Sequence, residues 1–229
     1  MKIEPQLVIV SGIAATGKSS TLTEVAKSVD NLFILEKDLV NQGSMFVKAK
    51  NFPRLPSFET YVKRDNVFPN CAVSIETPFG SMFQIDPKND FYARHARDQA
   101  YVIMGNIAES NLRHGKIPVI DCFVHRQIAD GTLKGFMEQE MFKGYEKSLI
   151  HFTCSEAECY KRRVARAEKD PHAEARDRET ISSRETFHDF ITNNQPLVPK
   201  ELNRYEHLLI DTTERAPKEC AEYLIDYIK

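Results

Sequence analysis

The chain of 229 residues has little glycine and no paired cysteines. Two of its nine glycines, Gly12 and Gly17, fall within one short run near the N-terminus. The five cysteines are scattered and form no C-x-x-C pair, which argues against a disulfide framework or a structural zinc site. No run approaches the roughly 18 apolar residues of a membrane span, and the N-terminal apolar run is too short for a signal peptide. We therefore expect a soluble, cytoplasmic protein.

An excess of charge is also missing. The 31 basic and 33 acidic side chains give a net charge of -2, so no global positive field attracts nucleic acid or an anionic membrane. A nucleic-acid partner is therefore not favoured, although a local basic patch is available to one, formed by Lys48, Lys50, Arg54, Lys63 and Arg64. With 41% hydrophobic and 28% charged residues, the composition is that of an ordinary folded protein. The length fits a single domain over residues 1–229.

Short apolar runs alternate with helical patterns along the chain. Residues 6–10 form a continuous apolar run that ends at a glycine, which predicts a strand buried on both faces. From residue 17 onward, apolar residues recur at helical spacing. Further strands are predicted at 32–38, 117–121, 147–154 and 207–211, and further helices at 93–111, 155–168 and 217–228. The alternation predicts an α/β fold with a five-stranded, mostly parallel sheet and helices on both faces.

An insertion at 52–87 interrupts this rhythm, because five prolines alternate there with phenylalanine and tyrosine. Two strand-like runs within it flank Thr77-Pro78-Phe79-Gly80, which predicts a β-hairpin. The segment either packs its own aromatic residues at an edge of the fold or covers a substrate.

Residues 12–19 read GIAATGKS and satisfy the phosphate-loop pattern G-x-x-x-x-G-K-[ST], after a buried strand and at the start of a helix. Glycine permits the tight curvature that wraps backbone N–H groups around phosphate, and the helix N-terminus adds positive potential. A turn that only connects strand to helix would not require Lys18 followed by Ser19. We expect ATP and Mg²⁺ as cofactors, with Lys18 on the β- and γ-phosphates and Ser19 as a metal ligand. The expected ATP-binding residues of the loop are Gly12, Ile13, Ala14, Ala15, Thr16, Gly17, Lys18, Ser19 and Ser20.

Other nucleotide-binding patterns are absent from the sequence. It contains no G-x-G-x-x-G of a dinucleotide site, no D-F-G of a protein kinase and no N-K-x-D of a guanine-binding protein. ATP is therefore favoured over a dinucleotide or a guanine nucleotide.

These motifs resemble those of the small P-loop kinases of the polynucleotide-kinase-like, chloramphenicol-phosphotransferase-like and zeta-toxin-like group. The resemblance covers residues 6–60 and 90–229 and implies a P-loop NTPase fold. It implies that Asp38, at the end of FILEKD, contacts the acceptor and is the catalytic base. A carboxylate at the carboxyl end of a parallel strand beside the P-loop lies where such sheets bind ligands. Asp38 can instead be the N-cap of a following helix.

After the P-loop and the run that ends in Asp38, the third match to the family is the run 117–121. It ends in Asp121 and has the Walker-B pattern that holds a magnesium-bound water. Buried strands often end in aspartate, so a purely structural role is equally open. His125 and Arg126 follow on the predicted loop, where they either contact substrate or form a solvated surface pair.

The fourth match is an arginine-rich segment, residues 155–190, that corresponds to the lid of the family. The resemblance assigns Arg163 and Arg166 to catalysis, Arg163 also to ATP binding, and Arg176 and Arg178 to substrate contact. Guanidinium groups from a lid stabilise the charge that develops on the γ-phosphoryl group.

Two further observations concern this segment and the last strand. The helix can instead be a solvated one, stabilised by pairs such as Glu158 with Arg162. Arg162 and Arg163 cannot both face the nucleotide, because adjacent helical residues point about 100° apart. The resemblance also places the loop that contains Thr212 near the adenine.

The expected activity is that of an ATP-dependent kinase that transfers the γ-phosphoryl group to a hydroxyl of a small molecule or a nucleic-acid end. A nucleoside-monophosphate-type kinase is an alternative, since its phosphate acceptor needs no base. A P-loop ATPase or switch that acts through a partner protein is another. The sequence does not name the acceptor.

Overall fold

The computed structural model describes residues 1–37, 46–48, 72–77, 80–85, 97–123, 125–169 and 177–229. The chain forms two compact units, one from Met1–Leu35 with Ala108–Lys229 and one from Glu36–Ile107. Some residues singled out in the sequence lie outside the described residues, namely Asp38, Lys50, Arg54, Lys63, Arg64 and Arg176.

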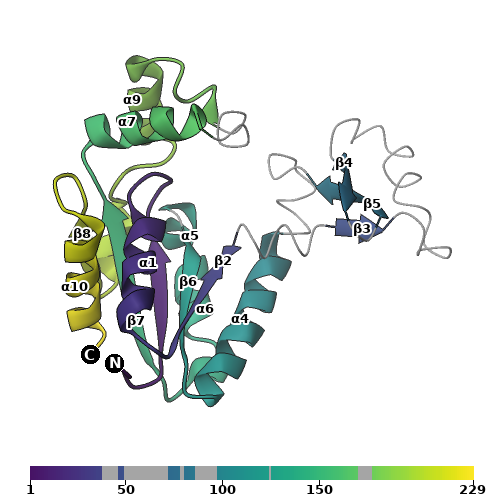
Figure 1. Ribbon diagram of the computed structural model, residues 1–229, viewed down its shortest axis with the longest axis vertical. Helices are drawn as coiled ribbons and strands as arrows, with labels where there is room; N and C mark the ends of the chain where they lie inside the picture. The colour runs from purple at the N-terminus through teal and green to yellow at the C-terminus, as the bar shows by residue number, and fades with distance from the viewer. Residues whose placement is uncertain (38–45, 49–71, 78–79, 86–96, 124, 170–176) are drawn as a thin grey trace. The chain divides into compact units, whose positions relative to one another are not determined.

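A five-stranded parallel sheet forms the centre of the first unit (Figure 1), with the strand order β2-β6-β1-β7-β8. The strands are β1 (Gln6–Ser11), β2 (Leu32–Glu36), β6 (Ile117–Phe123), β7 (Glu146–Thr153) and β8 (Leu208–Asp211). In β1, Val10 is paired with Asp121 of β6 and with Ile150 of β7. The predicted α/β fold with a parallel sheet is confirmed. β1 is the central strand, so the segment that follows it emerges from the middle of the sheet.

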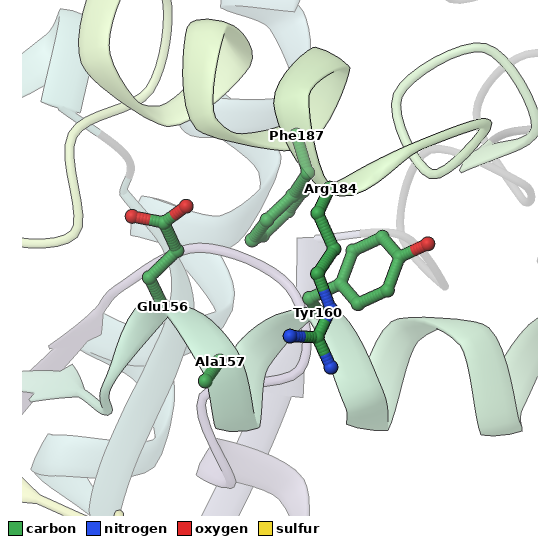
Figure 2. Close-up of a pocket in the computed structure, with 5 residues that line it drawn as sticks. All are labelled: Glu156, Ala157, Tyr160, Arg184 and Phe187. Carbon is green, nitrogen blue, oxygen red and sulfur yellow. The ribbon is translucent and has the colours of Figure 1, made fainter.

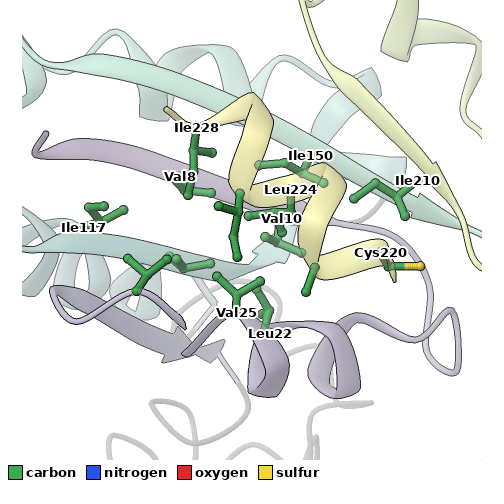
Figure 3. Packing of buried hydrophobic residues seen from close by; sticks show 14 of the residues in the cluster. Val8, Val10, Leu22, Val25, Ile117, Ile150, Ile210, Cys220, Leu224 and Ile228 are labelled. Atoms are coloured by element: carbon green, nitrogen blue, oxygen red, sulfur yellow. The ribbon is translucent and has the colours of Figure 1, made fainter. Parts of the chain in front are cut away.

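One face of this sheet is covered by α1 (Lys18–Ser28) and α10 (Pro217–Tyr227), which pack against each other. Figure 3 shows Val8 and Val10 of β1 meeting Leu22 of α1 and Leu224 of α10 in a common apolar core. The alternate residues of β1 are also fully buried. Because alternate side chains of a strand point to opposite faces, β1 is buried on both sides, as its continuous apolar run predicts.

The remaining helices of the first unit lie between its later strands. Between β6 and β7 come α5 (His125–Ala129), α6 (Thr132–Met137) and the 3₁₀ helix η2 (Glu140–Phe142). Between β7 and β8 come α7 (Glu156–Ala167), α9 (Arg184–Asn193) and the 3₁₀ helix η3 (Lys200–Arg204). The prediction of a loop at His125 and Arg126 was wrong, since both residues belong to the first turn of α5. In the described part of the chain, no helix has the length and apolarity needed to cross a membrane.

The second unit contains a three-stranded antiparallel sheet with the order β3-β5-β4. Its strands are β3 (Phe46–Lys48), β4 (Ala72–Thr77) and β5 (Gly80–Ile85). Thr77 pairs with Gly80, so β4 and β5 are the two arms of a hairpin, as the sequence predicts. The helix α4 (Arg97–Arg113) begins in this unit and ends in the first.

Asn31, in the turn between α1 and β2, connects three parts of the first unit. Its side-chain amide donates hydrogen bonds to the carbonyls of Ile3 (2.8 Å) and Gly115 (3.0 Å). Its side-chain oxygen accepts a hydrogen bond from the Ile3 N–H (3.2 Å). Since Asn31 is buried, these backbone groups have no ready access to water as a substitute.

We predict that Asn31→Ala lowers the free energy of unfolding by about 2–4 kcal/mol, because it leaves two buried backbone groups of Ile3 and the partly buried carbonyl of Gly115 without that partner. Urea denaturation followed by circular dichroism measures the change. The neighbouring Asp30→Ala is the control, because Asp30 is exposed and its replacement should change stability by less than about 1 kcal/mol. Equal stability of the two variants would contradict the role given to Asn31.

Candidate functional site

The P-loop connects β1 to α1 and turns at residues with left-handed backbone angles. Gly12 has φ 126° and Gly17 has φ 83°. A Cβ at Gly12 would lie 2.4 Å from the carbonyl oxygen of Phe152, and one at Gly17 would lie 3.3 Å from the side chain of Thr212. Both positions therefore require glycine, in agreement with the curvature expected from the motif.

Ala15 also has a left-handed conformation, with φ 70°, and it is the one non-glycine residue of the described chain with a positive φ. This conformation costs an alanine about 1–2 kcal/mol. The motif places no demand on that position, so this strain could not be predicted from the pattern. The surrounding structure must compensate for it.

Lys18 and Asp121 meet beside the loop. The Lys18 Nζ donates hydrogen bonds to the carbonyls of Gly12 (2.9 Å) and Ile13 (3.0 Å) and lies 4.0 Å from the Asp121 Oδ1. Asp121 is in place because its strand register sets it beside the end of β1. Ser19 follows in the first turn of α1, where it is exposed. The structure thus brings the predicted phosphate-binding lysine and the predicted metal-linked carboxylate together.

Thr212, just beyond β8, packs under the P-loop. Its hydroxyl lies 3.1 Å from the Thr16 carbonyl and 3.2 Å from the Thr153 carbonyl, and can donate to either. Arg162 of α7 donates to the Thr212 carbonyl (2.7 Å) and hydroxyl oxygen (2.8 Å), and to Glu158 (2.9 Å). The predicted Glu158–Arg162 pair therefore exists, but Arg162 also connects α7 to the loop beneath the P-loop. That second contact was not predicted, because no local pattern reports it.

Arg163 lies on a different side of α7 and is only 3% exposed. Its Nε donates to the Ala14 carbonyl at 3.3 Å, and its guanidinium carbon lies 5.4 Å and 5.1 Å from the ring centres of Phe187 and Phe190. Burial lowers the pKa of Arg163, and the nearby carboxylate of Asp177 opposes that shift. As predicted, Arg162 and Arg163 face different partners.

Arg166 pairs with Asp177, whose carboxylate also lies 3.8 Å from Arg163. The Arg166 side chain is 33% exposed, yet its Nε is buried and has no hydrogen-bond partner. Asp177 was not predicted, because one acidic residue among many charged neighbours carries no distinguishing signal. Arg178 is exposed.

On α5, two polar side chains have buried atoms without a hydrogen-bond partner, the Nδ1 of His125 and the Oε1 of Gln127. Burial lowers the pKa of His125, Glu201 raises it, and Arg126 lowers it. Arg126 is exposed. Gln127 was missed because a single glutamine in the sequence is uninformative.

No protein-family model matches the sequence, and neither does any curated protein. Solved structures do match. A candidate kinase from Chloroflexus aurantiacus j-10-fl is similar with a TM-score of 0.55 and 14% identity, over 99% of this chain and 100% of that one. A sugar kinase from Janibacter sp. HTCC2649 is similar with a TM-score of 0.50 and 12% identity, over 97% of this chain and 94% of that one. The chain has a P-loop kinase-like fold.

A small cavity of about 270 Å³ lies between α7 and α9 (Figure 2). Its lining consists of Glu156, Ala157, Tyr160, Arg184 and Phe187. The Arg184 guanidinium carbon lies 5.9 Å from the centre of the Tyr160 ring. Both Arg184 and Arg163 lie against aromatic rings, but Arg184 is exposed and Arg163 is buried.

His151 of β7 is hydrogen-bonded to Ser11, the residue that precedes the P-loop. Its Nε2 lies 2.7 Å from the Leu197 carbonyl and its Nδ1 lies 2.8 Å from the Ser11 hydroxyl. A carbonyl only accepts, so Nε2 carries the proton and Nδ1 accepts from Ser11. Burial lowers the pKa of His151 to about 4; the Leu197 carbonyl raises it, and the charges of His207 and Lys18 lower it further.

This histidine makes stability depend on pH. The unfolded chain binds a proton below pH 6.5 and the folded chain binds it only near pH 4, so acid favours unfolding. We predict that wild type loses about 3 kcal/mol more unfolding free energy than His151→Asn between pH 7 and pH 4. Urea titrations of both proteins across this range measure the difference. Parallel pH curves for the two proteins would show the prediction to be wrong.

Proposed function

We propose that the protein is an ATP-dependent phosphotransferase that transfers the γ-phosphoryl group to a hydroxyl of a small molecule. The observation that carries the proposal is the P-loop, in which left-handed residues turn the backbone around Lys18 next to the Asp121 carboxylate. Backbone N–H groups of such a loop bind phosphate oxygens, and the lysine is suited to the β- and γ-phosphates.

In the proposed reaction the acceptor hydroxyl oxygen forms a bond to the γ-phosphorus. The bond between that phosphorus and the β–γ bridging oxygen breaks, and ADP leaves. Asp38, the second residue after β2 in the sequence, takes the proton of the hydroxyl, as a carboxylate general base can. Arg166, whose side chain is partly exposed and pairs with Asp177, offers positive charge to the transferred group.

The residues present fit Mg²⁺. Magnesium in such sites uses one or two protein oxygens, with phosphates and waters as the other ligands. Ser19, at the exposed start of α1, and Asp121 offer these oxygens. The ion, when bound with ATP, neutralises charge on the β- and γ-phosphates.

Two observations support a hydroxyl acceptor on the β6 side of the site. His125 has an unpaired ring nitrogen just beyond Asp121, which suits a hydrogen bond to a hydroxyl. One of the similar structures is a sugar kinase. The near-zero net charge makes a small acceptor preferable to a polynucleotide.

We predict that one acceptor class stimulates ADP production in a coupled assay across nucleosides, nucleoside monophosphates, sugars, antibiotics and 5′-hydroxyl oligonucleotides.

Lys18→Ala should abolish turnover, because it removes the positive charge that faces the phosphates. Asp38→Asn should keep the Kd for ATP and lower kcat by about 10²–10⁴-fold, because only the base is lost.

The matched control is Lys27→Ala, an exposed lysine of the same helix that pairs with Glu24 and should leave turnover unchanged. Full transfer to a phosphate acceptor by Asp38→Asn would favour a nucleoside-monophosphate-type kinase instead. ATP hydrolysis that ignores every acceptor and rises only with a protein partner would sink the kinase proposal.

A further inference from the structure

The carbonyl oxygen of Ala14, at the middle of the P-loop, is held from outside by α7. Arg163 donates to it from Nε at 3.3 Å, and the thiol of Cys159 donates to it at 3.6 Å. Cys159 and Arg163 are four residues apart, so they lie on the same side of the helix. Neither is accessible to solvent, with exposures of 0% and 3%.

This contact fixes the orientation of one peptide group. In a planar trans peptide the C=O and N–H bonds point in opposite directions. The Ala14 carbonyl points to α7, so the N–H of Ala15 points away from it. The left-handed φ of Ala15 belongs to the same peptide arrangement. Backbone N–H groups turned in this way are the donors that bind phosphate in such loops.

Arg163 is itself immobilised. Its guanidinium lies over the rings of both Phe187 and Phe190 from α9, and the Asp177 carboxylate is 3.8 Å away. A buried charge that loses its partners is costly, so leaving this position to reach a phosphate would be unfavourable. Arg166, one turn further along α7, pairs with the same Asp177 carboxylate but is a third exposed and contacts neither ring. The two arginines of the R-x-x-R pattern are therefore in different environments.

We propose that Arg163 is a positioning residue that orients the Ala14–Ala15 peptide for phosphate binding and does not contact phosphate, in contrast to the role proposed above for Arg166. The proposal rests on the proposed function, because it assumes that the P-loop binds ATP. The two roles differ in one measurable respect. An oriented P-loop serves ADP and ATP alike, whereas a γ-phosphate contact serves ATP only.

The test measures the Kd of ADP and of ATP by calorimetry, with thermal melting of each variant alongside. Arg163→Met retains most of the apolar packing against the two rings and removes the hydrogen bond to Ala14. We expect it to raise both Kd values by about tenfold and by the same factor, as the loss of one charge-assisted hydrogen bond predicts. Arg166→Met should raise the Kd for ATP and leave that for ADP within about twofold.

Arg184→Met is the matched control, since Arg184 also lies on an aromatic ring of this helix pair but faces the cavity of Figure 2. It should leave both Kd values unchanged. If Arg163→Met does not fold, Phe190→Leu provides the second variant, because it removes one ring that holds the guanidinium. It should raise both Kd values equally, by about threefold, although Phe190 belongs to α9.

The outcomes separate the two proposals. Wild type that binds neither nucleotide would refute the proposed function. Wild type that binds both, together with unchanged affinities in folded Arg163→Met, would refute the positioning role alone. A loss confined to ATP in Arg163→Met would also refute it, because it would identify Arg163 as a γ-phosphate contact.

Discussion

Every carbonyl group of a tightly turned loop needs a hydrogen-bond donor, and the candidate site is organised around this requirement. A loop that turns its N–H groups toward a ligand must find partners for its carbonyls elsewhere. Lys18 serves the carbonyls of Gly12 and Ile13. The Ala14 carbonyl accepts from Arg163, and that of Thr16 accepts from Thr212. The donors come from three separate segments, so α1, α7 and the loop after β8 converge on one backbone path.

The parts of the fold that were predicted from the sequence are those where burial or an unusual backbone angle restricts which amino acids fit. A parallel strand covered on both faces requires a continuous apolar run, so the strands were recognised at their apolar centres, as in β1. The two glycines of the P-loop were recognised because no Cβ fits at either place. Lys18 was recognised as part of the P-loop pattern, and Asp121 as the last residue of a buried apolar run.

The parts that the sequence missed depend on tertiary contacts. The short helix α5 has no long apolar period, so its first residues were assigned to a loop. Arg162 and Arg163 look alike in the sequence, and only packing directs one to Thr212 and the other onto two phenylalanine rings. Asp177 pairs with arginines distant from it along the chain, and no local pattern reports such a pair.

Because β1 is the central strand, it is protected from local unfolding. Strands pair with β1 along both of its sides, and its side chains are buried, so we expect its amide hydrogens to be among the last of the first unit to exchange with solvent. The hairpin of β4 and β5 belongs to a separate sheet in a separate unit. Local opening of that sheet breaks none of the backbone ladders that anchor the P-loop.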